Sequence, residues 1–246
     1  MSKILMLTEG KDPDKKLIEH IINEFQIKGE VIWAKIGTIY AFYKDIKEKY
    51  DENMDIIRYI KYKYSDKISK EFKASEVSYV YLFFDYDLHS KLNEEYENIE
   101  KIYERINEIS EINNFFEDET GNGKLYLSFP MIEAYHKPIG CNYIYEKNNF
   151  EEKLKDFTDF KKKIKNETGN MGMKAIKSQY KKVINFYIDN SENILEMKFK
   201  DVEKNKILKF QNELLKEENK VKIYPSIPIF LNEYYDIEKL QEKLKI

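Results

Sequence analysis

The alternation of short apolar runs with longer amphipathic segments in the first 145 residues constrains this fold more than any other feature. Runs that predict strands lie at 3–10, 29–37, 77–87 and 124–129. Helical spacing of apolar residues fills the intervals between them, as at Tyr96, Ile99, Ile102, Tyr103 and Ile106. Strands joined through helices pair in parallel, because the connection must cross back over the sheet. The sequence therefore predicts an α/β fold, a Rossmann-like parallel sheet flanked by helices.

The chain is expected to divide into two parts. The turn signals of "KPIGCN" mark a boundary between a catalytic domain at 1–145 and a mostly helical region at 146–246. In the second part we expect helices at about 149–166, 171–188 and 192–219, then an apolar extended piece and a last helix.

Charge and cysteine content exclude several classes of protein. The single cysteine, Cys141, excludes an internal disulfide framework and a four-cysteine zinc site. No apolar run is long enough to span a membrane, so we expect a cytoplasmic protein. The net charge is −3, yet segment 161–182 has eight Lys against one Glu. That segment predicts contact with nucleic-acid phosphates, although a solvated helix face is an equal alternative.

Carboxylates follow three of the predicted strands. Glu9 ends the first strand, Asp85 and Asp87 end the third, and Glu133 comes shortly after the fourth. The carboxyl ends of parallel strands share one edge of a sheet, which is where open α/β sheets bind ligands. Clustered carboxylates require a cation, and Mg²⁺ or Mn²⁺ prefers such oxygen donors. The alternative is that Asp85 caps the next helix and that Glu133 only begins one.

Three segments carrying these acids resemble the Toprim family. The segments are "LMLTEGKDPDKKLIEHI", "LFFDYDLHS" and "KLYLSFPMIEAY", in this order. The nearest resemblance is to the OLD and RloB-like Toprim nucleases of bacterial phage defence. It implies a Toprim fold in which Glu9 is a general acid/base or metal ligand, Asp85 and Asp87 hold Mg²⁺, and Glu133 completes a second metal position. It also implies a catalytic lysine, for which Lys124 and Lys137 are the candidates.

The resemblance implies a metal-dependent nuclease that hydrolyses DNA or RNA, tRNA included, as an effector of anti-phage defence. It further implies regulation by a separately encoded ATPase or another partner, and it is compatible with a homodimer. Two divalent ions can activate water and neutralise charge at a phosphodiester. No Gly-rich phosphate loop with its Lys and Ser/Thr is present in the sequence, which argues against ATP hydrolysis by that route.

Two alternatives remain open at the level of sequence. A phosphatase of the haloacid dehalogenase kind also carries a DxD motif at a strand end. That class has Thr or Val two residues after the second Asp, where this chain has His89. The other alternative is a non-catalytic Toprim-like sensor or scaffold for a partner ATPase.

Overall fold

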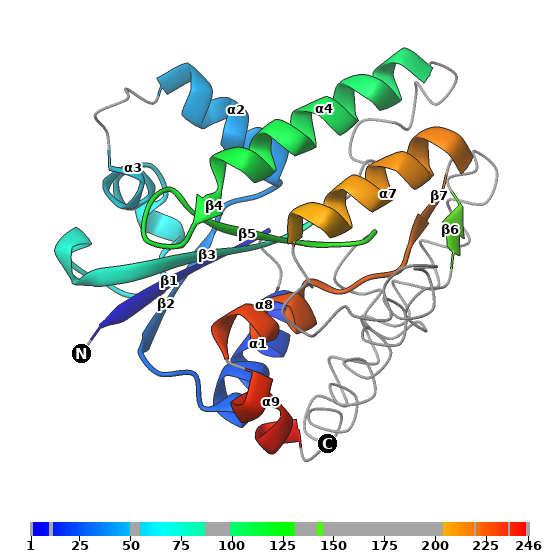
Figure 1. Ribbon diagram of the computed structural model, residues 1–246. Helices are drawn as coiled ribbons and strands as arrows, with labels where there is room; N and C mark the ends of the chain where they lie inside the picture. Colours follow the sequence, from blue (N-terminus) through cyan, green and yellow to red (C-terminus); the bar gives the residue numbers. More distant parts are fainter. Residues whose placement is uncertain are drawn as a thin grey trace.

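The computed structural model describes residues 2–9, 12–49, 55–86, 99–130, 142–144, 204–218, 220–235 and 237–244. Figure 1 shows a sheet in the middle of the molecule with helices on both of its faces. The predicted α/β class, with a mostly parallel sheet flanked by helices, is confirmed. None of the helices in these ranges is long and apolar enough to cross a membrane.

The main sheet has five strands in the order β2-β1-β3-β5-β4. β1 pairs in parallel with β2 and β3, β3 pairs in parallel with β5, and β4 runs antiparallel to β5. The central strands are apolar on both faces because helices cover both faces. The strand bounds are Lys3–Thr8 (β1), Glu30–Lys35 (β2), Val77–Asp85 (β3), Glu117–Asp118 (β4) and Gly123–Ser128 (β5).

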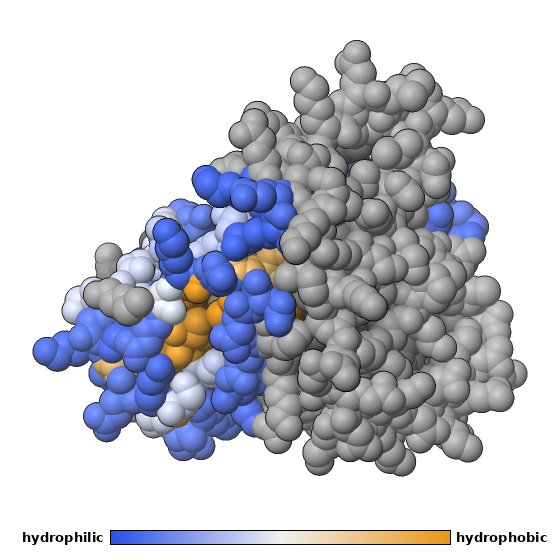
Figure 2. Space-filling model, turned by 90° about the horizontal axis from the view of Figure 1, so that it is seen from below, coloured by the Kyte–Doolittle hydropathy of each residue, from blue (hydrophilic) through white to orange (hydrophobic). Residues whose placement is uncertain are grey.

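Helices form a layer on each side of the sheet. One layer contains α2, α4 and α7, and the other contains α1, α8 and α9 (Figure 1). The bounds of all the described helices are Asp12–Phe25 (α1), Ile39–Lys49 (α2), Ile56–Lys63 (α3), Ile99–Phe115 (α4), Lys204–Glu218 (α7), Ser226–Tyr234 (α8) and Ile237–Leu244 (α9). Short 3-10 helices lie at Ser65–Lys67 (η1) and Ala74–Glu76 (η2). Figure 2 views the α1, α8 and α9 side, where hydrophilic residues border a hollow that exposes hydrophobic ones.

The end of the chain contributes directly to the core. After β7 (Lys220–Lys222), which pairs with β6 (Asn142–Ile144), the chain forms α8 where we expected an extended piece. The Phe230 ring of α8 packs against Tyr81, Phe83 and Tyr126 at centroid distances of 5.1, 5.2 and 5.5 Å. One hydrophobic cluster therefore joins α8 to the sheet.

The second predicted part is described only at its ends. Helix α7 lies within the helix expected at 192–219, and α9 agrees with the expected last helix. The predicted helices at 149–166 and 171–188, and the basic segment 161–182, fall outside the described residues. A mostly helical region at 146–246 and a boundary at residue 145 stay predictions.

Gly123 allows the β4–β5 hairpin to lie close to β3. Its φ of +103° belongs to the region that side chains other than glycine rarely adopt. A Cβ at this position would lie 2.6 Å from Leu82 Cδ1 and 2.9 Å from Val80 Cγ1. Residues 119–122 form the turn between β4 and β5, and only glycine fits the first position of β5.

Candidate functional site at the carboxyl edge of the sheet

The strand order changes direction between β1 and β3. From β1 the chain moves outward to β2 on one side and then returns to place β3 on the other side. Open α/β sheets bind ligands in the crevice at such a switch point, outside the carboxyl ends of the strands. Glu9 follows β1 and Asp85 is the last residue of β3. The two carboxylates predicted from the sequence therefore flank the switch point.

The backbone at Glu9 is fixed by the end of β2. The Ile36 amide donates to the Thr8 carbonyl at 3.1 Å, and the Gly37 amide donates to the Glu9 carbonyl at 3.1 Å. Gly37 has a φ of +90°, a conformation that favours glycine. These bonds extend the β1–β2 pairing beyond the last ladder residues and hold partly buried Glu9 at the edge of the sheet.

Asp85 lies on the face of the sheet that α8 covers. Side chains alternate along a strand, so Asp85 shares a face with Phe83, whose ring contacts Phe230 of α8. Asp85 pairs in register with Ser128 of β5 and is itself partly buried. β1 and β3 are neighbouring strands about 4.8 Å apart, so the backbones at Glu9 and Asp85 lie at the same edge of the sheet.

Tyr86 anchors the chain immediately after Asp85. Its hydroxyl donates to Asn212 Oδ1 of α7 at 2.6 Å, and its carbonyl accepts a 3.0 Å bond from the Tyr40 hydroxyl. Its amide donates to the Ser128 carbonyl at 3.0 Å. Tyr86 is fully buried, and burial raises the pKa of its hydroxyl well above the ordinary value. The helix layer thereby fixes the backbone that presents Asp85.

A buried serine pair joins the carboxyl edge to α8. The Ser128 hydroxyl donates to Ser226 Oγ at 2.9 Å, and the Ser226 amide donates to Ser128 Oγ at 3.3 Å. Ser226 is the first residue of α8, so the N-terminus of this helix lies on the face that carries Asp85. A helix N-terminus bears partial positive charge, which favours carboxylates and phosphates nearby.

Sequence reasoning missed Tyr86 and Ser226 as parts of this edge. The only local signal for Tyr86 was its place between two aspartates. Nothing in the sequence around Ser226 marked a helix start, because Pro225 and Pro228 indicated an extended segment. Pro228 is accommodated because it lies in the first turn of α8, where the amide lacks a helical partner.

The structure describes only part of the predicted metal site. Asp87, Glu133 and Lys137 lie outside the described residues. Among the residues that the structure does describe, no group of three or more His, Cys, Asp or Glu side chains could hold a metal ion. Glu9 and Asp85 are oxygen donors of the kind that Mg²⁺ and Mn²⁺ prefer, so their chemistry suits such an ion. Completing the site requires further ligands from beyond these two residues.

Lys124 lies away from this edge. It stands at the start of β5, paired in register with Tyr81, about 13 Å along the strand from Ser128. Its amine lies 2.8 Å from Glu233 and 3.6 Å from Glu119. Burial opposes the charged amine, but these carboxylates outweigh it and raise the pKa of Lys124. The structure does not bring Lys124 together with Glu9 and Asp85.

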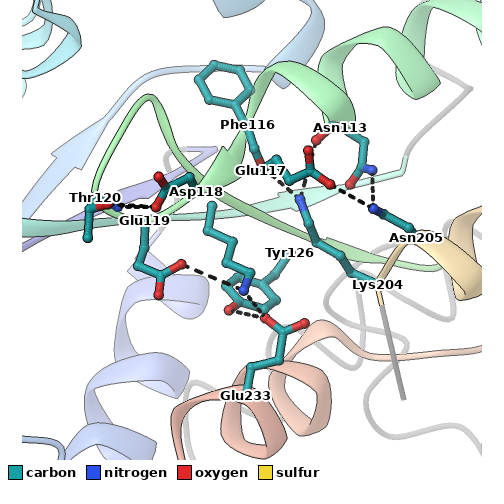
Figure 3. A network of polar contacts seen from close by, with 11 residues as sticks. Asn113, Phe116, Glu117, Asp118, Glu119, Thr120, Tyr126, Lys204, Asn205 and Glu233 are labelled. Atoms are coloured by element: carbon teal, nitrogen blue, oxygen red, sulfur yellow. Dashed lines mark hydrogen bonds and ion pairs between the residues drawn. The ribbon is translucent and has the colours of Figure 1, made fainter. Parts of the chain in front are cut away.

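Lys204 is a second lysine at the same end of β5. Figure 3 shows it beside Asn113 and Phe116, while Tyr126 donates to Glu233 at 2.8 Å nearby. The Lys204 amine donates to the Phe116 carbonyl at 2.7 Å and to the Asn113 carbonyl at 3.3 Å. Burial lowers its pKa to about 8. Lys204 thus joins the start of α7 to the carbonyl end of α4.

No protein-family model matches the chain, and neither curated proteins nor solved structures include a significant match.

Proposed function

We propose that this protein is a Mg²⁺- or Mn²⁺-dependent nuclease that hydrolyses phosphodiester bonds of DNA or RNA. The observation that carries the proposal is the position of Glu9 and Asp85 on both sides of the β1–β3 switch point. Both carboxylates lie partly buried at the edge where open α/β sheets bind ligands, and carboxylate oxygens are donors that Mg²⁺ and Mn²⁺ prefer.

Each residue has a proposed part in the reaction. Asp85 and Asp87 hold a divalent ion, and Glu133 holds a second one. The ions supply an activated water and offset the charge that develops on the phosphate. Glu9 acts as general acid/base or as a ligand. Tyr86 is a positioning residue, since its bonds fix the backbone next to Asp85.

The resemblance to Toprim nucleases of phage defence supplies the biological part of the proposal. The chain would act on invading or cellular nucleic acid, with tRNA among the substrates, and a separately encoded ATPase or regulator would control it. Lys124 is left out of the catalytic group because of its ion pairs at the other end of β5. Lys137 stays the candidate for the catalytic lysine.

Purified protein tests the proposal directly. Plasmid, single-stranded DNA and total tRNA are incubated with Mg²⁺, with Mn²⁺ or with a chelator. We expect metal-dependent cleavage of at least one substrate, and its loss in Glu9→Gln and in Asp85→Asn. Glu213→Gln is the matched control, because it also neutralises a carboxylate but lies half-exposed on α7. Equal activity in Glu9→Gln, Asp85→Asn and wild type would refute the proposed site.

The same preparations separate the alternatives. A phosphatase of the haloacid dehalogenase kind hydrolyses small phosphomonoesters and leaves polynucleotides intact. A sensor or scaffold cleaves neither substrate and shows no heat of Mg²⁺ or Mn²⁺ binding that depends on Asp85. Either result would replace the nuclease proposal.

A further inference from the structure

A second surface, at the opposite edge of the sheet, gathers cations around an exposed tyrosine. A shallow pocket of about 550 Å³ there is lined by Arg58, Lys61, Tyr62, Lys73, Ala74 and Ser75. We call these residues the α3 basic surface, since the first three belong to α3 and the others lead into and form η2. Figure 1 places α3 near the amino ends of the strands, away from the carboxyl edge.

The charges of the α3 basic surface are poorly compensated. Its lining has three cationic side chains and no carboxylate. Among the described residues neither the Lys61 nor the Lys73 amine lies within ion-pair distance of a carboxylate, although Glu76 lies near Lys73 and accepts from its backbone amide at 3.0 Å. Arg58 is 3.8 Å from Asp55, but its side chain is 78% exposed, so water weakens that attraction.

In a neighbouring cavity, by contrast, ion pairs with carboxylates offset part of the lysine charge. This cavity, of about 680 Å³, shares Lys61 and Lys73 with the α3 basic surface. Its other lysines are paired, because Lys3 lies 2.8 Å from Glu76 and Lys70 lies 2.8 Å from Glu30. Glu71 and Glu76 also line this cavity, so the surplus of positive charge is largest on the α3 side, at Arg58, Lys61 and Lys73.

The fold holds these side chains in place. Asp55 caps α3 by accepting from the Ile57 amide at 2.8 Å, and Ile56, Tyr59 and Ile60 bury one side of the helix. Lys61 donates to the Phe72 carbonyl, which ties α3 to the loop that carries Lys73. On the opposite side of α3, Tyr62 is 86% exposed.

We propose that the α3 basic surface binds a single-stranded segment of nucleic acid. Phosphates lie against Arg58, Lys61 and Lys73, and a base stacks on Tyr62. Basic grooves with aromatic platforms bind single strands in this way, because every base has a face that can stack. The choice of nucleic acid over other polyanions depends on the proposed nuclease function.

The distance between the α3 basic surface and the carboxyl edge indicates how the surface contributes to the proposed nuclease function. β3 runs from Val77, next to η2, to Asp85, so the strand separates the two ends by about 26 Å. A substrate bound at both ends must be long enough to cover that distance. The α3 basic surface thus holds a part of the substrate remote from the bond that is cleaved, and it favours long polynucleotides over short ones.

Binding without catalysis tests the inference. Fluorescence anisotropy measures affinity for a labelled oligothymidylate long enough to reach both edges, in chelator and at several salt concentrations. The variants are Arg58→Gln/Lys73→Gln and Tyr62→Ala. Matched controls are Lys44→Gln/Lys209→Gln, whose side chains are 70% and 80% exposed, and Tyr103→Ala, at 41% exposure.

We expect the double charge variant to reduce the slope of log affinity against log salt by about 1.4, since each phosphate contact on a single strand contributes about 0.7. Tyr62→Ala should weaken binding roughly 5- to 150-fold. The controls should keep wild-type affinity and slope. Inorganic polyphosphate, which has charge but no bases, should bind to wild type and to Tyr62→Ala with equal affinity.

Three results would overturn the inference. The first is that the wild type does not bind oligothymidylate. The second is that the variants lose no more affinity or salt dependence than the controls do. The third is that Tyr62→Ala binds as tightly as the wild type. The last result would assign the surface to polyanions in general. Because all binding is measured in chelator, a protein that binds through the α3 basic surface yet cleaves nothing refutes the nuclease proposal alone.

Discussion

Raising the pH should stabilise this protein through one buried side chain, Lys204. Its pKa falls from the ordinary 10.5 to about 8 because burial penalises the charged amine. Between these values the unfolded chain still binds the proton that the folded protein has released. Stability rises with pH wherever the unfolded state binds more protons, so the sign is a gain. Each pKa unit corresponds to about 1.36 kcal/mol, which gives about 3 kcal/mol over the whole window.

Urea unfolding at a series of pH values from 7 to 10.5 measures this gain. Lys204→Met removes the titrating amine but keeps an apolar stem of similar length, so its stability should lack the rise. Lys209→Met is the control, because this lysine belongs to the same helix and its side chain is 80% exposed. Buried tyrosines with raised pKa values, such as Tyr86, lower stability near and above pH 10 in all three proteins.

The difference between wild type and Lys204→Met isolates the lysine from the tyrosines. That difference should grow in favour of wild type as the pH rises through 8 and beyond. A constant difference, or one that shrinks, would refute the claim that Lys204 is buried against the end of α4 with its amine desolvated.

Other substitutions test the fold and the support of the candidate site. Gly123→Ala should destabilise the protein by about 1–3 kcal/mol in urea unfolding, because the new Cβ meets Leu82; wild-type stability would contradict the strained φ. Tyr86→Phe should cost about 1–3 kcal/mol by leaving buried Asn212 Oδ1 without its donor, and metal-dependent cleavage should fall with it. Unchanged cleavage would show that the anchor does not position the site. Glu233→Gln should cost about 1 kcal/mol and leave cleavage intact, since Glu233 of α8 pairs with Lys124 at the start of β5, away from the carboxyl edge. Loss of cleavage would restore Lys124 as a catalytic candidate.

Much of the sheet could be predicted because local and long-range requirements agree there. Strands β1, β2, β3 and β5 are apolar runs between turn residues, and their helical connections leave parallel pairing as the simplest arrangement. The strand-end positions of Glu9 and Asp85 followed from the same pattern. The order β2-β1-β3 shows that the ends of β1 and β3 lie at one edge of the sheet, while the convergence of the Glu9 and Asp85 side chains on one site stays a prediction.

The rest depended on contacts between distant parts of the chain. Helix α8 contains Ile227, Pro228 and Ile229, which are poor helix formers, so its stability comes from packing on the sheet. The spacing of apolar residues in the sequence does not reveal that packing. The same holds for Tyr86 and its partner Asn212, which are 126 residues apart. The α3 basic surface could not be predicted because Lys73, Ala74 and Ser75 join the α3 residues only in the folded chain.

The serine pair between β5 and α8 has a consequence for the time at which the candidate site matures during synthesis. Ser128 and Ser226 are separated by 98 residues. At translation rates of about 5 to 20 residues per second, roughly 5 to 20 seconds pass between their additions to the chain. During that interval β3 and β5 exist without the helix that covers Phe83 and Tyr126. A ribosome-bound chain that stops before α8 should therefore expose this aromatic face, recruit chaperones, and lack the completed carboxyl edge.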